Sequence, residues 1–263
     1  MVTDEKRRYL IAAPMYNEEK VARLVVEDLL HDVQSLDIDF EILIIDDGST
    51  DRTTEILAAF RDRITVQRNA RNQGVGAAFA AMLEYCRQHD KTHFVFQEGS
   101  YKVRASEIVK IIRVSEENDY DYIMGSRFLR QEDSVQTPWQ RRTLIRSFSA
   151  LFQMITGFPV TDITCGPRMI RMAFWNNALN SMTRYYGYQF EHLITIWLLH
   201  YGARFRAVEI EIQYPELRRY SYINLGNIWQ IIEPWVHYCL WRLIRLPLLK
   251  PGWLLPRGDK QEL

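Results

Sequence analysis

Short apolar runs alternate with longer amphipathic segments along the first half of the chain. The short runs have the length of buried strands, whereas the longer segments repeat their apolar residues about every 3.6 positions, as helices do. Strands are predicted over residues 9–13, 40–45, 64–67, 93–96 and 122–125, and helices over residues 21–33, 53–60, 76–87 and 106–117. No internal repeat or low-complexity segment competes with this pattern.

This alternation predicts an α/β fold with a mostly parallel central sheet and helices on both faces. In such folds ligands bind beyond the carboxyl ends of the strands. The polar clusters of the chain follow the predicted strands directly, at residues 14–19, 46–51 and 69–74. A binding site is therefore expected at that edge of the sheet.

Composition narrows the classes of function. The chain has 263 residues, 47% of them hydrophobic, so it can bury the core of one large domain. Its 33 Lys and Arg residues balance its 33 Asp and Glu residues, which leaves no global electrostatic reason to bind nucleic acid. The three cysteines have no metal-type spacing, and reduced thiols in a cytosolic compartment are expected. No secretory signal is expected, and the longest stretch without charged residues, 147–161, is too short to span a membrane.

The turn after the second predicted strand carries the first candidate chemistry. Asp46 and Asp47 end a run of Ile and Leu, and Gly48 permits a tight turn with positive φ. Two interpretations are open for these residues alone. The turn is either a well-capped connection to the next helix, or one carboxylate accepts hydrogen bonds from the ribose or the base of a nucleotide.

Three segments at strand ends, taken together, resemble the nucleotide-binding half of the family-2 glycosyltransferases of the GT-A type. Residues 14–18 read P-M-Y-N-E, residues 46–53 read D-D-G-S-T-D-R-T, and residues 72–78 read N-Q-G-V-G-A-A. These match the family patterns P-x-Y-N-E, D-D-G-S-x-D-x-T and N-x-G-x-G-x-A in the same order. The ordered set is far more specific than any one of its members.

The second half of the chain extends the resemblance. Residues 125–127 read G-S-R, residues 156–166 read T-G-F-P-V-T-D-I-T-C-G and are followed by Arg168 and Arg171, and residues 187–191 read G-Y-Q-F-E. The segment 210–221 is similar to the ending of enzymes that transfer mannose or glucose to dolichyl or other polyprenyl phosphates. The resemblance covers residues 8 to 225. It divides the chain into a GT-A glycosyltransferase domain, 1–225, and a tail, 226–263.

The resemblance implies roles for individual residues. The donor nucleotide would be bound by Pro14, Tyr16, Glu18, Asp46, Asp47, Asn72, Gly74, Arg218, Arg219 and Ser221, with Asp47 as the main acceptor and the arginines on phosphate. Asp162 and Glu191 would be candidate bases or orienting carboxylates, and Arg127 a further catalytic cation. For each arginine a carboxylate-paired side chain is the alternative, and for Asp162 a helix cap.

One family motif is missing. The fourth strand of these enzymes ends in Asp-x-Asp, whose carboxylates bind the Mg²⁺ or Mn²⁺ that bridges the donor diphosphate. Here the strand runs into Q-E-G-S-Y-K over residues 97–102, and only Glu98 remains as a candidate ligand. Three accounts stay open: Glu98 holds a metal weakly, Lys102 or Arg104 replaces the metal as a counter-charge, or transfer activity has been lost.

The tail combines tryptophans with basic residues, a composition typical of the membrane interface. Peripheral attachment at the cytoplasmic face of the membrane is therefore predicted, and packing on the domain or on a second subunit is the alternative. The predicted function is inverting transfer of a hexose from a nucleotide-diphosphate sugar to polyprenyl phosphate. There are two alternatives. One is a regulatory protein that binds a nucleotide, and the other is a transferase that acts on a soluble acceptor and forms an oligomer through its tail.

Overall fold

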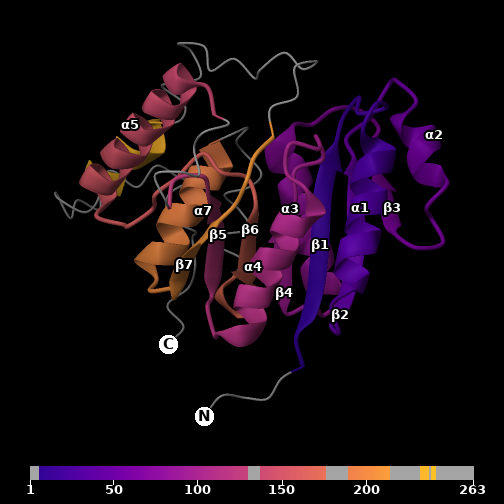
Figure 1. Cartoon of the computed structure of the whole chain (residues 1–263), viewed down its shortest axis with the longest axis horizontal. Helices are drawn as coiled ribbons and strands as arrows, with labels where there is room; N and C mark the ends of the chain where they lie inside the picture. The colour runs from indigo at the N-terminus through magenta and orange to yellow at the C-terminus, as the bar shows by residue number, and fades with distance from the viewer. Residues whose placement is uncertain (1–5, 130–136, 176–188, 214–231, 237, 241–263) are drawn as a thin grey trace.

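A computed structural model describes residues 6–129, 137–175, 189–213, 232–236 and 238–240. Its centre is a seven-stranded sheet in the order β3-β2-β1-β4-β6-β5-β7 (Figure 1). The strands are β1 (Arg8–Met15), β2 (Asp39–Asp46), β3 (Thr65–Arg68), β4 (His93–Phe96), β5 (Tyr122–Ser126), β6 (Arg168–Arg171) and β7 (Phe205–Glu209). The helices are α1 (Ala22–Gln34), α2 (Thr53–Ala58), α3 (Val75–Gln88), α4 (Ala105–Glu117), α5 (Trp139–Thr156), the 3₁₀ turn η2 (Met172–Phe174) and α7 (Gln189–His200).

All strand pairs are parallel except those of β6, which runs antiparallel to both β4 and β5. The predicted fold class, a mostly parallel sheet covered by helices, is confirmed. The antiparallel strand was not predicted. Its reversal has a direct consequence: Arg168 at the start of β6 pairs with Phe96 at the end of β4, whereas Arg171 pairs with His93 at the beginning of β4. Arg168 thus lies near the carboxyl ends of the parallel strands, and Arg171 lies near their amino ends.

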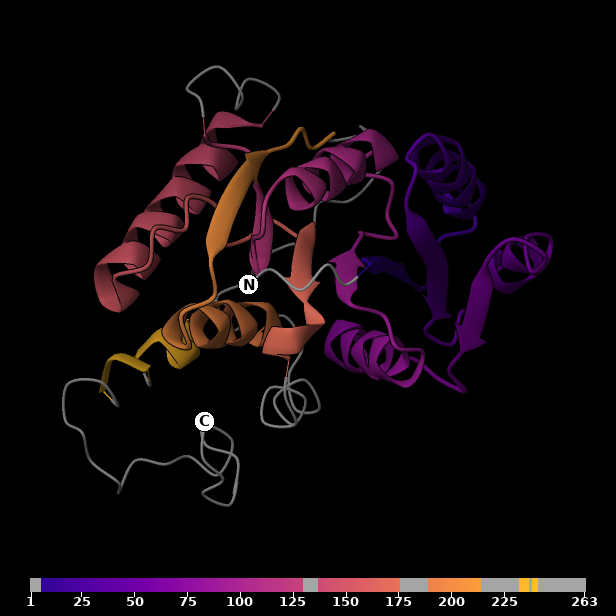
Figure 2. The same ribbon diagram turned by 90° about the horizontal axis from the view of Figure 1, so that it is seen from below.

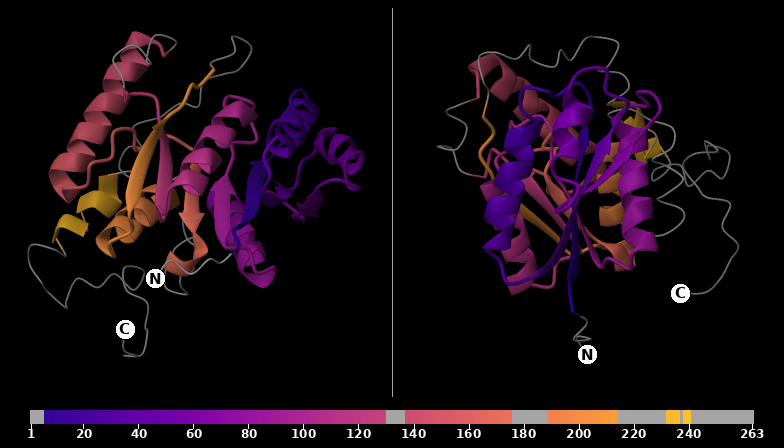
Figure 3. Two further views of the ribbon diagram at one scale, coloured as in Figure 1. Left: turned by 60° about the horizontal axis from the view of Figure 1, so that its bottom comes forward. Right: turned by 90° about the vertical axis from the view of Figure 1, so that its right-hand side faces the viewer.

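Strand β1 shows why helices cover both faces. Successive side chains of a strand point to opposite faces. Tyr9, Ile11 and Ala13 pack in the core beneath α1 and α4, whereas Leu10 and Ala12 pack in the core that contains α3, α5 and α7. Figure 3 shows the two helical layers on either side of the sheet. A strand buried on both faces reads as an unbroken apolar run, which is the signal in the sequence.

The described part of the tail belongs to the second of these cores. Trp235 and Tyr238 are almost fully buried. The Trp235 ring lies edge-on to Phe148 and Phe152 of α5, at centroid distances of 6.0 and 5.4 Å, and the Tyr238 hydroxyl lies 3.1 Å from Nδ1 of His200 on α7. Residues 214–231 are outside the described ranges, so the predicted boundary at 225 stays a prediction. Among the described helices, none is both long and apolar enough to cross a bilayer.

Candidate active site

The carboxyl ends of β1 and β2 are joined by hydrogen bonds between the loops that follow them. The backbone N–H of Thr50 donates to Oδ1 of Asn17 at 2.8 Å, and the N–H of Glu18 donates to Oγ1 of Thr53 at 2.8 Å. Asn17 has φ of 54°, in the left-handed region that Asn tolerates better than most residues. These bonds hold the loop that carries Pro14, Tyr16 and Glu18 against the β2 turn. The Tyr16 side chain remains 43% exposed at this edge, where a ring can stack on a base.

Asp47 organises the loop that precedes α3. Its carboxylate accepts hydrogen bonds from Nδ2 of Asn69 at 2.7 Å, from the N–H of Gln73 at 3.0 Å and from the N–H of Gly74 at 2.8 Å. Asp47 therefore links β2 to the third predicted motif. The side chain that the sequence marks as the main nucleotide acceptor is also the one that holds the loop in place.

Gly48 allows this close approach. Its φ is +75°, and a Cβ at this position would lie 2.5 Å from the backbone carbon of Arg71, so only glycine fits between the two loops. The next contact is made by Asn72, whose Oδ1 accepts from the N–H of Gly74 at 2.9 Å. Apart from its chain neighbours, no described residue has a heavy atom within 4 Å of the Cβ position of Gly74, so its backbone is open on that side.

Asp46 has a different environment. Its side chain is fully buried, its Oδ1 accepts from the N–H of Ser49 at 2.9 Å, and its Oδ2 accepts from the Thr54 hydroxyl at 2.5 Å. Arg68 adds a contact of 3.6 Å from its Nε to the same Oδ2. These donors all come from the chain itself, so the geometry supports the capped-turn interpretation for Asp46. Its donor-binding role stays a prediction.

The residues after β4 differ from the Asp-x-Asp metal site of the family in their geometry as well as in their identity. Gln97 is buried, and its Nε2 donates to the carbonyl of Val103 at 2.8 Å. At Gly99, a Cβ would lie 2.1 Å from the carbonyl oxygen of Pro14, so this backbone position has no room for an aspartate. Among residues 97–102 the one carboxylate is that of Glu98, which packs against Gly166 so closely that a Cβ there would be 2.3 Å from its Oε1.

Glu191 and Arg168 form the second polar centre of the site. Nη2 of Arg168 lies 2.9 Å from Oε2 of Glu191, and the same guanidinium donates to the carbonyls of Gly166 and Cys165 at 2.8 and 2.7 Å. Burial raises the pKa of Glu191 to about 7; the positive charge of Arg168 opposes this shift and the nearby Glu98 carboxylate adds to it. Glu191 therefore titrates near neutral pH, in the range suited to a general base.

Arg127 and Asp162 are brought together as a buried pair. Nε of Arg127 lies 2.6 Å from Oδ2 of Asp162 and its Nη2 lies 2.7 Å from Oδ1, a two-pronged contact. Asp162 is fully buried and Arg127 is 3% exposed. A further bond runs from Nη2 to the Thr164 hydroxyl at 2.6 Å. For Arg127 the carboxylate-paired alternative is thus present in the structure, and the catalytic roles of both residues stay predictions.

Some predicted residues are not brought to the site by the described structure. Arg218, Arg219 and Ser221 lie outside the described ranges. Arg104, one of the two candidate replacements for the metal, pairs instead with Asp28 of α1 at 2.9 Å and stacks over the Tyr101 ring. Lys102 is the remaining candidate, because its ammonium makes no ion pair with any described residue. No group of three or more His, Cys, Asp or Glu side chains in the described ranges could hold a metal ion.

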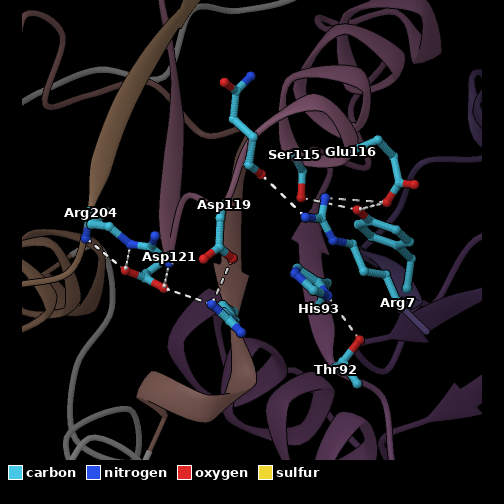
Figure 4. Close-up of polar contacts among 11 residues, drawn as sticks. Arg7, Thr92, His93, Ser115, Glu116, Asp119, Asp121 and Arg204 are labelled. Carbon is cyan, nitrogen blue, oxygen red and sulfur yellow. Dashed lines mark hydrogen bonds and ion pairs between the residues drawn. The ribbon is translucent and has the colours of Figure 1, made fainter. Parts of the chain in front are cut away.

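Another polar cluster lies at the beginning of β5 and β7 and at the end of β6, away from the candidate site; Figure 4 shows Asp119, Asp121 and Arg204 within it. Asp121 pairs with Arg171 at 3.3 Å and with Arg204 at 3.0 Å, and Asp119 pairs with the same two arginines at 2.9 and 2.6 Å. Burial, with Arg7 and Arg171 nearby, lowers the pKa of His93 to about 4. This network ties β5, β6 and β7 together at the ends that lie away from the candidate site.

Two features of the site were missed by sequence reasoning. Arg168 was noted only as a basic residue following a motif, and its burial against Glu191 depends on the reversed strand β6. The contact of Glu98 with Gly166 joins residues that are 68 positions apart, and no local pattern indicates it. Gly166 itself was a signal in the sequence, because it ends the motif segment 156–166.

The three interlocked loops and the carboxylate–arginine centre lie at the carboxyl ends of the parallel strands, where α/β folds bind ligands. Residues 10–177 match the family described as Glycosyl transferase family 2. The chain belongs to this family.

Curated relatives are about a quarter identical to this chain over the aligned residues. Polyprenol monophosphomannose synthase of Mycolicibacterium smegmatis is 26% identical over 80% of this chain and 78% of its own length. Undecaprenyl-phosphate 4-deoxy-4-formamido-L-arabinose transferase of Proteus mirabilis is 26% identical over 87% of this chain and 68% of its own length. Both names describe transfer or synthesis on a polyprenyl phosphate.

Solved structures confirm the fold. Glucosyl-3-phosphoglycerate synthase of Mycobacterium tuberculosis in complex with UDP superposes with a TM-score of 0.63, at 15% identity, over 90% of this chain and 80% of that chain. The complex of the same enzyme with Mn²⁺, UDP and glucosyl-3-phosphoglycerate superposes with a TM-score of 0.64, at 15% identity, over 87% and 80% of the two chains. At this identity the likeness establishes the GT-A fold alone.

Proposed function

We propose that this chain transfers a hexose from a nucleotide-diphosphate sugar to a polyprenyl phosphate, with inversion at the anomeric carbon. The observation that carries the proposal is the set of hydrogen bonds that the Asp47 carboxylate accepts from Asn69, Gln73 and Gly74, because these bonds bring two of the family-like motifs together at one edge of the sheet. The names of the two curated relatives support the acceptor class.

The reaction requires positioning more than a strong base. An acceptor phosphate oxygen is already ionised at neutral pH; it attacks the anomeric carbon, and the bond from that carbon to the donor diphosphate breaks. Holding the two reactants in line supplies much of the rate enhancement. Glu191 is proposed to orient the acceptor or the sugar, and the positive charge of Arg168 favours its ionised form. Arg218, Arg219 and Ser221 are proposed to bind phosphate, and the Arg127–Asp162 pair to hold the loop around Thr164.

The family implies Mg²⁺ or Mn²⁺, and Mn²⁺ is present in the structural neighbour. The residues after β4 do not fit the usual clamp, because Gln97 is bonded to Val103, position 99 has no room for a side chain, and Glu98 alone offers a carboxylate. We therefore derive no step through a metal. Lys102 is proposed as the counter-charge to the donor diphosphate, since Arg104 is already paired with Asp28.

A second candidate function is a nucleotide-binding regulatory protein without transfer activity, and the missing Asp-x-Asp motif favours it. Peripheral contact with the cytoplasmic face of the membrane is proposed for either function. The alternative to a lipid acceptor is a soluble acceptor, in which case the tail would serve as the interface of a homo-oligomer.

One experiment separates these candidates. The purified chain is titrated with UDP- and GDP-hexoses, and transfer to a short-chain polyprenyl phosphate is assayed with Mn²⁺ and with EDTA. We expect binding and turnover that persist in EDTA and that decrease in Lys102→Ala but not in the paired control Lys110→Ala. Binding without turnover in every condition would support the regulatory protein. Turnover abolished by EDTA and restored by Mn²⁺ would restore the metal to the mechanism.

A further inference from the structure

The loop between β4 and α4, residues 97–104, has a backbone conformation that its own sequence does not favour. Tyr101 has φ of 58°, in the left-handed region that a bulky residue rarely adopts. The other non-glycine residues with positive φ in the described ranges are Asn17 and Asp90, and these two residue types tolerate the region. Such a backbone persists only where surrounding contacts impose it, so the neighbours of Tyr101 must hold the loop in place.

Helix α1 takes part in the contacts that hold Tyr101. The Tyr101 ring packs against the core beneath α1 and α4, and the guanidinium of Arg104 lies 4.7 Å from the ring centroid. Nε of Arg104 lies 2.9 Å from Oδ2 of Asp28 on α1. Burial first, and then the Asp28 carboxylate, raise the pKa of Tyr101, so its hydroxyl keeps its proton. We call Asp28, Tyr101 and Arg104 the Asp28 clamp; Figure 2 shows α1 and α4 side by side on one face of the sheet.

Two hydrogen bonds fix other parts of this loop. Nε2 of Gln97 donates to the carbonyl of Val103 at 2.8 Å and so joins the two ends of the loop. The N–H of Gln213, a residue that follows β7 in the chain, donates to the carbonyl of Lys102 at 2.8 Å. The backbone at Lys102 is therefore held both by its neighbour Tyr101, through the Asp28 clamp, and by the segment after β7.

The Asp28 clamp also distinguishes the two cations of the loop. Arg104 is engaged by a carboxylate and a ring, whereas Lys102 makes no ion pair with any residue in the described ranges. One cation is therefore used by the fold, and the other is left for a ligand on a backbone that is already fixed. A charge that is in place before an anion binds stabilises that anion without the entropy cost of ordering a loop.

We propose that Asp28 and Tyr101 are positioning residues of the donor site, which fix the loop so that Lys102 meets the diphosphate of the nucleotide sugar. This inference rests on the proposed function, in which Lys102 is the counter-charge to the donor. Asp28 and Tyr101 act through the backbone of Lys102 rather than by binding the donor themselves. Because Asp28 belongs to α1, the inference gives a helix that carries none of the family motifs a part in donor binding.

Titration of the full chain with UDP and GDP, and with the matching nucleosides uridine and guanosine, tests the proposal. Nucleotide and nucleoside differ by the diphosphate that Lys102 would meet. The variants are Asp28→Asn, which removes the charge of the clamp, and Tyr101→Gly, which removes its ring and relieves the left-handed backbone. They break the clamp at different residues, so one of them suffices if the other fails to fold. The matched control is Glu27→Gln, which removes the same charge from the next residue of α1, where the side chain is 50% exposed.

We expect Asp28→Asn and Tyr101→Gly each to weaken binding of the nucleotide by about fivefold or more and binding of the nucleoside by less than about twofold. Glu27→Gln should bind both ligands as wild type does. Each clamp variant is also combined with Lys102→Ala. In that background the clamp variants should cause no further loss of nucleotide affinity, a result that a merely structural role of the clamp would not produce.

Several outcomes would overturn the proposal. Unchanged nucleotide affinity in both clamp variants, equal losses for nucleotide and nucleoside, or losses that add to that of Lys102→Ala would remove the positioning role and leave the proposed function standing. Stronger nucleotide binding in Asp28→Asn would show that the released Arg104 meets the diphosphate itself. If Lys102→Ala alone leaves nucleotide affinity unchanged, the counter-charge in the proposed function fails, and the positioning role fails with it.

Discussion

Replacing Asp162 by asparagine should destabilise the protein strongly, because the change leaves the Arg127 guanidinium buried without its counter-charge. The pair is joined by two contacts of 2.6 and 2.7 Å, and both side chains are almost completely removed from solvent. Breaking such a pair from one side costs about 3–5 kcal/mol. In a chain of this size each kcal/mol lowers the melting temperature by ~2–4 °C, so a decrease of roughly 6–20 °C is expected.

Calorimetry or thermal unfolding followed by circular dichroism measures this difference. The matched control is Asp119→Asn, which removes the same charge from a carboxylate that also pairs with arginines but is 36% exposed. Ion pairs at such exposure contribute ~0–1 kcal/mol, so the control should melt within a few degrees of wild type. The double variant Arg127→Met with Asp162→Asn removes the orphaned charge, and it should recover part of the lost stability.

Asp162 was predicted from the sequence as a catalytic carboxylate, and the same experiment separates that role from a structural one. If Asp162→Asn melts at the control temperature but loses all transfer activity, the carboxylate acts on substrate and the reasoning from burial is wrong. If the melting temperature falls as expected and nucleotide binding persists below it, the pair positions the loop rather than reacting.

Three further outcomes follow from the site. Asp47→Ala should release the loop before α3 and cost about 1–3 kcal/mol from unsatisfied donors, with UDP affinity falling in the same titration; unchanged UDP affinity would show that the loop is held by other contacts. For Glu191, the folded-state pKa of about 7 lies above its ordinary value of 4.5, so its contribution to stability is complete below about pH 4.5 and is lost as pH rises from there to about 7. The unfolding free energy of wild type relative to Glu191→Gln should therefore fall across this range in denaturant titrations, and a flat difference would contradict the shift. Gly99→Ala should unfold the protein more readily than Gly166→Ala, because the first Cβ meets a backbone carbonyl and the second meets only the movable end of Glu98; equal melting temperatures would contradict this.

The sequence by itself determined the elements of the first half and their order. Strands β1, β2, β4 and β5 are buried on one or both faces, so their residues must be apolar in unbroken runs, and the helices between them keep their apolar side chains at helical spacing. Predicted and observed bounds differ by one or two residues for most elements, and α2 ends at Ala58, with the chain continuing to Phe60 as a turn. The position predicted for the site rests on the same pattern, because parallel strands bring their carboxyl ends to one edge.

Only the tertiary structure decided what the charged residues at that edge do. A motif gives the identity of a carboxylate but not its neighbours, and the neighbours come from distant parts of the chain. Asp46 is satisfied within its own turn and Asp47 holds the next loop, although the two are adjacent in sequence. Arg168 meets Glu191 because β6 runs antiparallel, and the direction of a four-residue strand is set by its pairing partners rather than by its own residues. Exposure is likewise a property of the packed molecule: α5 and the tail have similar apolar and basic compositions, but Trp235 is buried and Trp139 faces solvent.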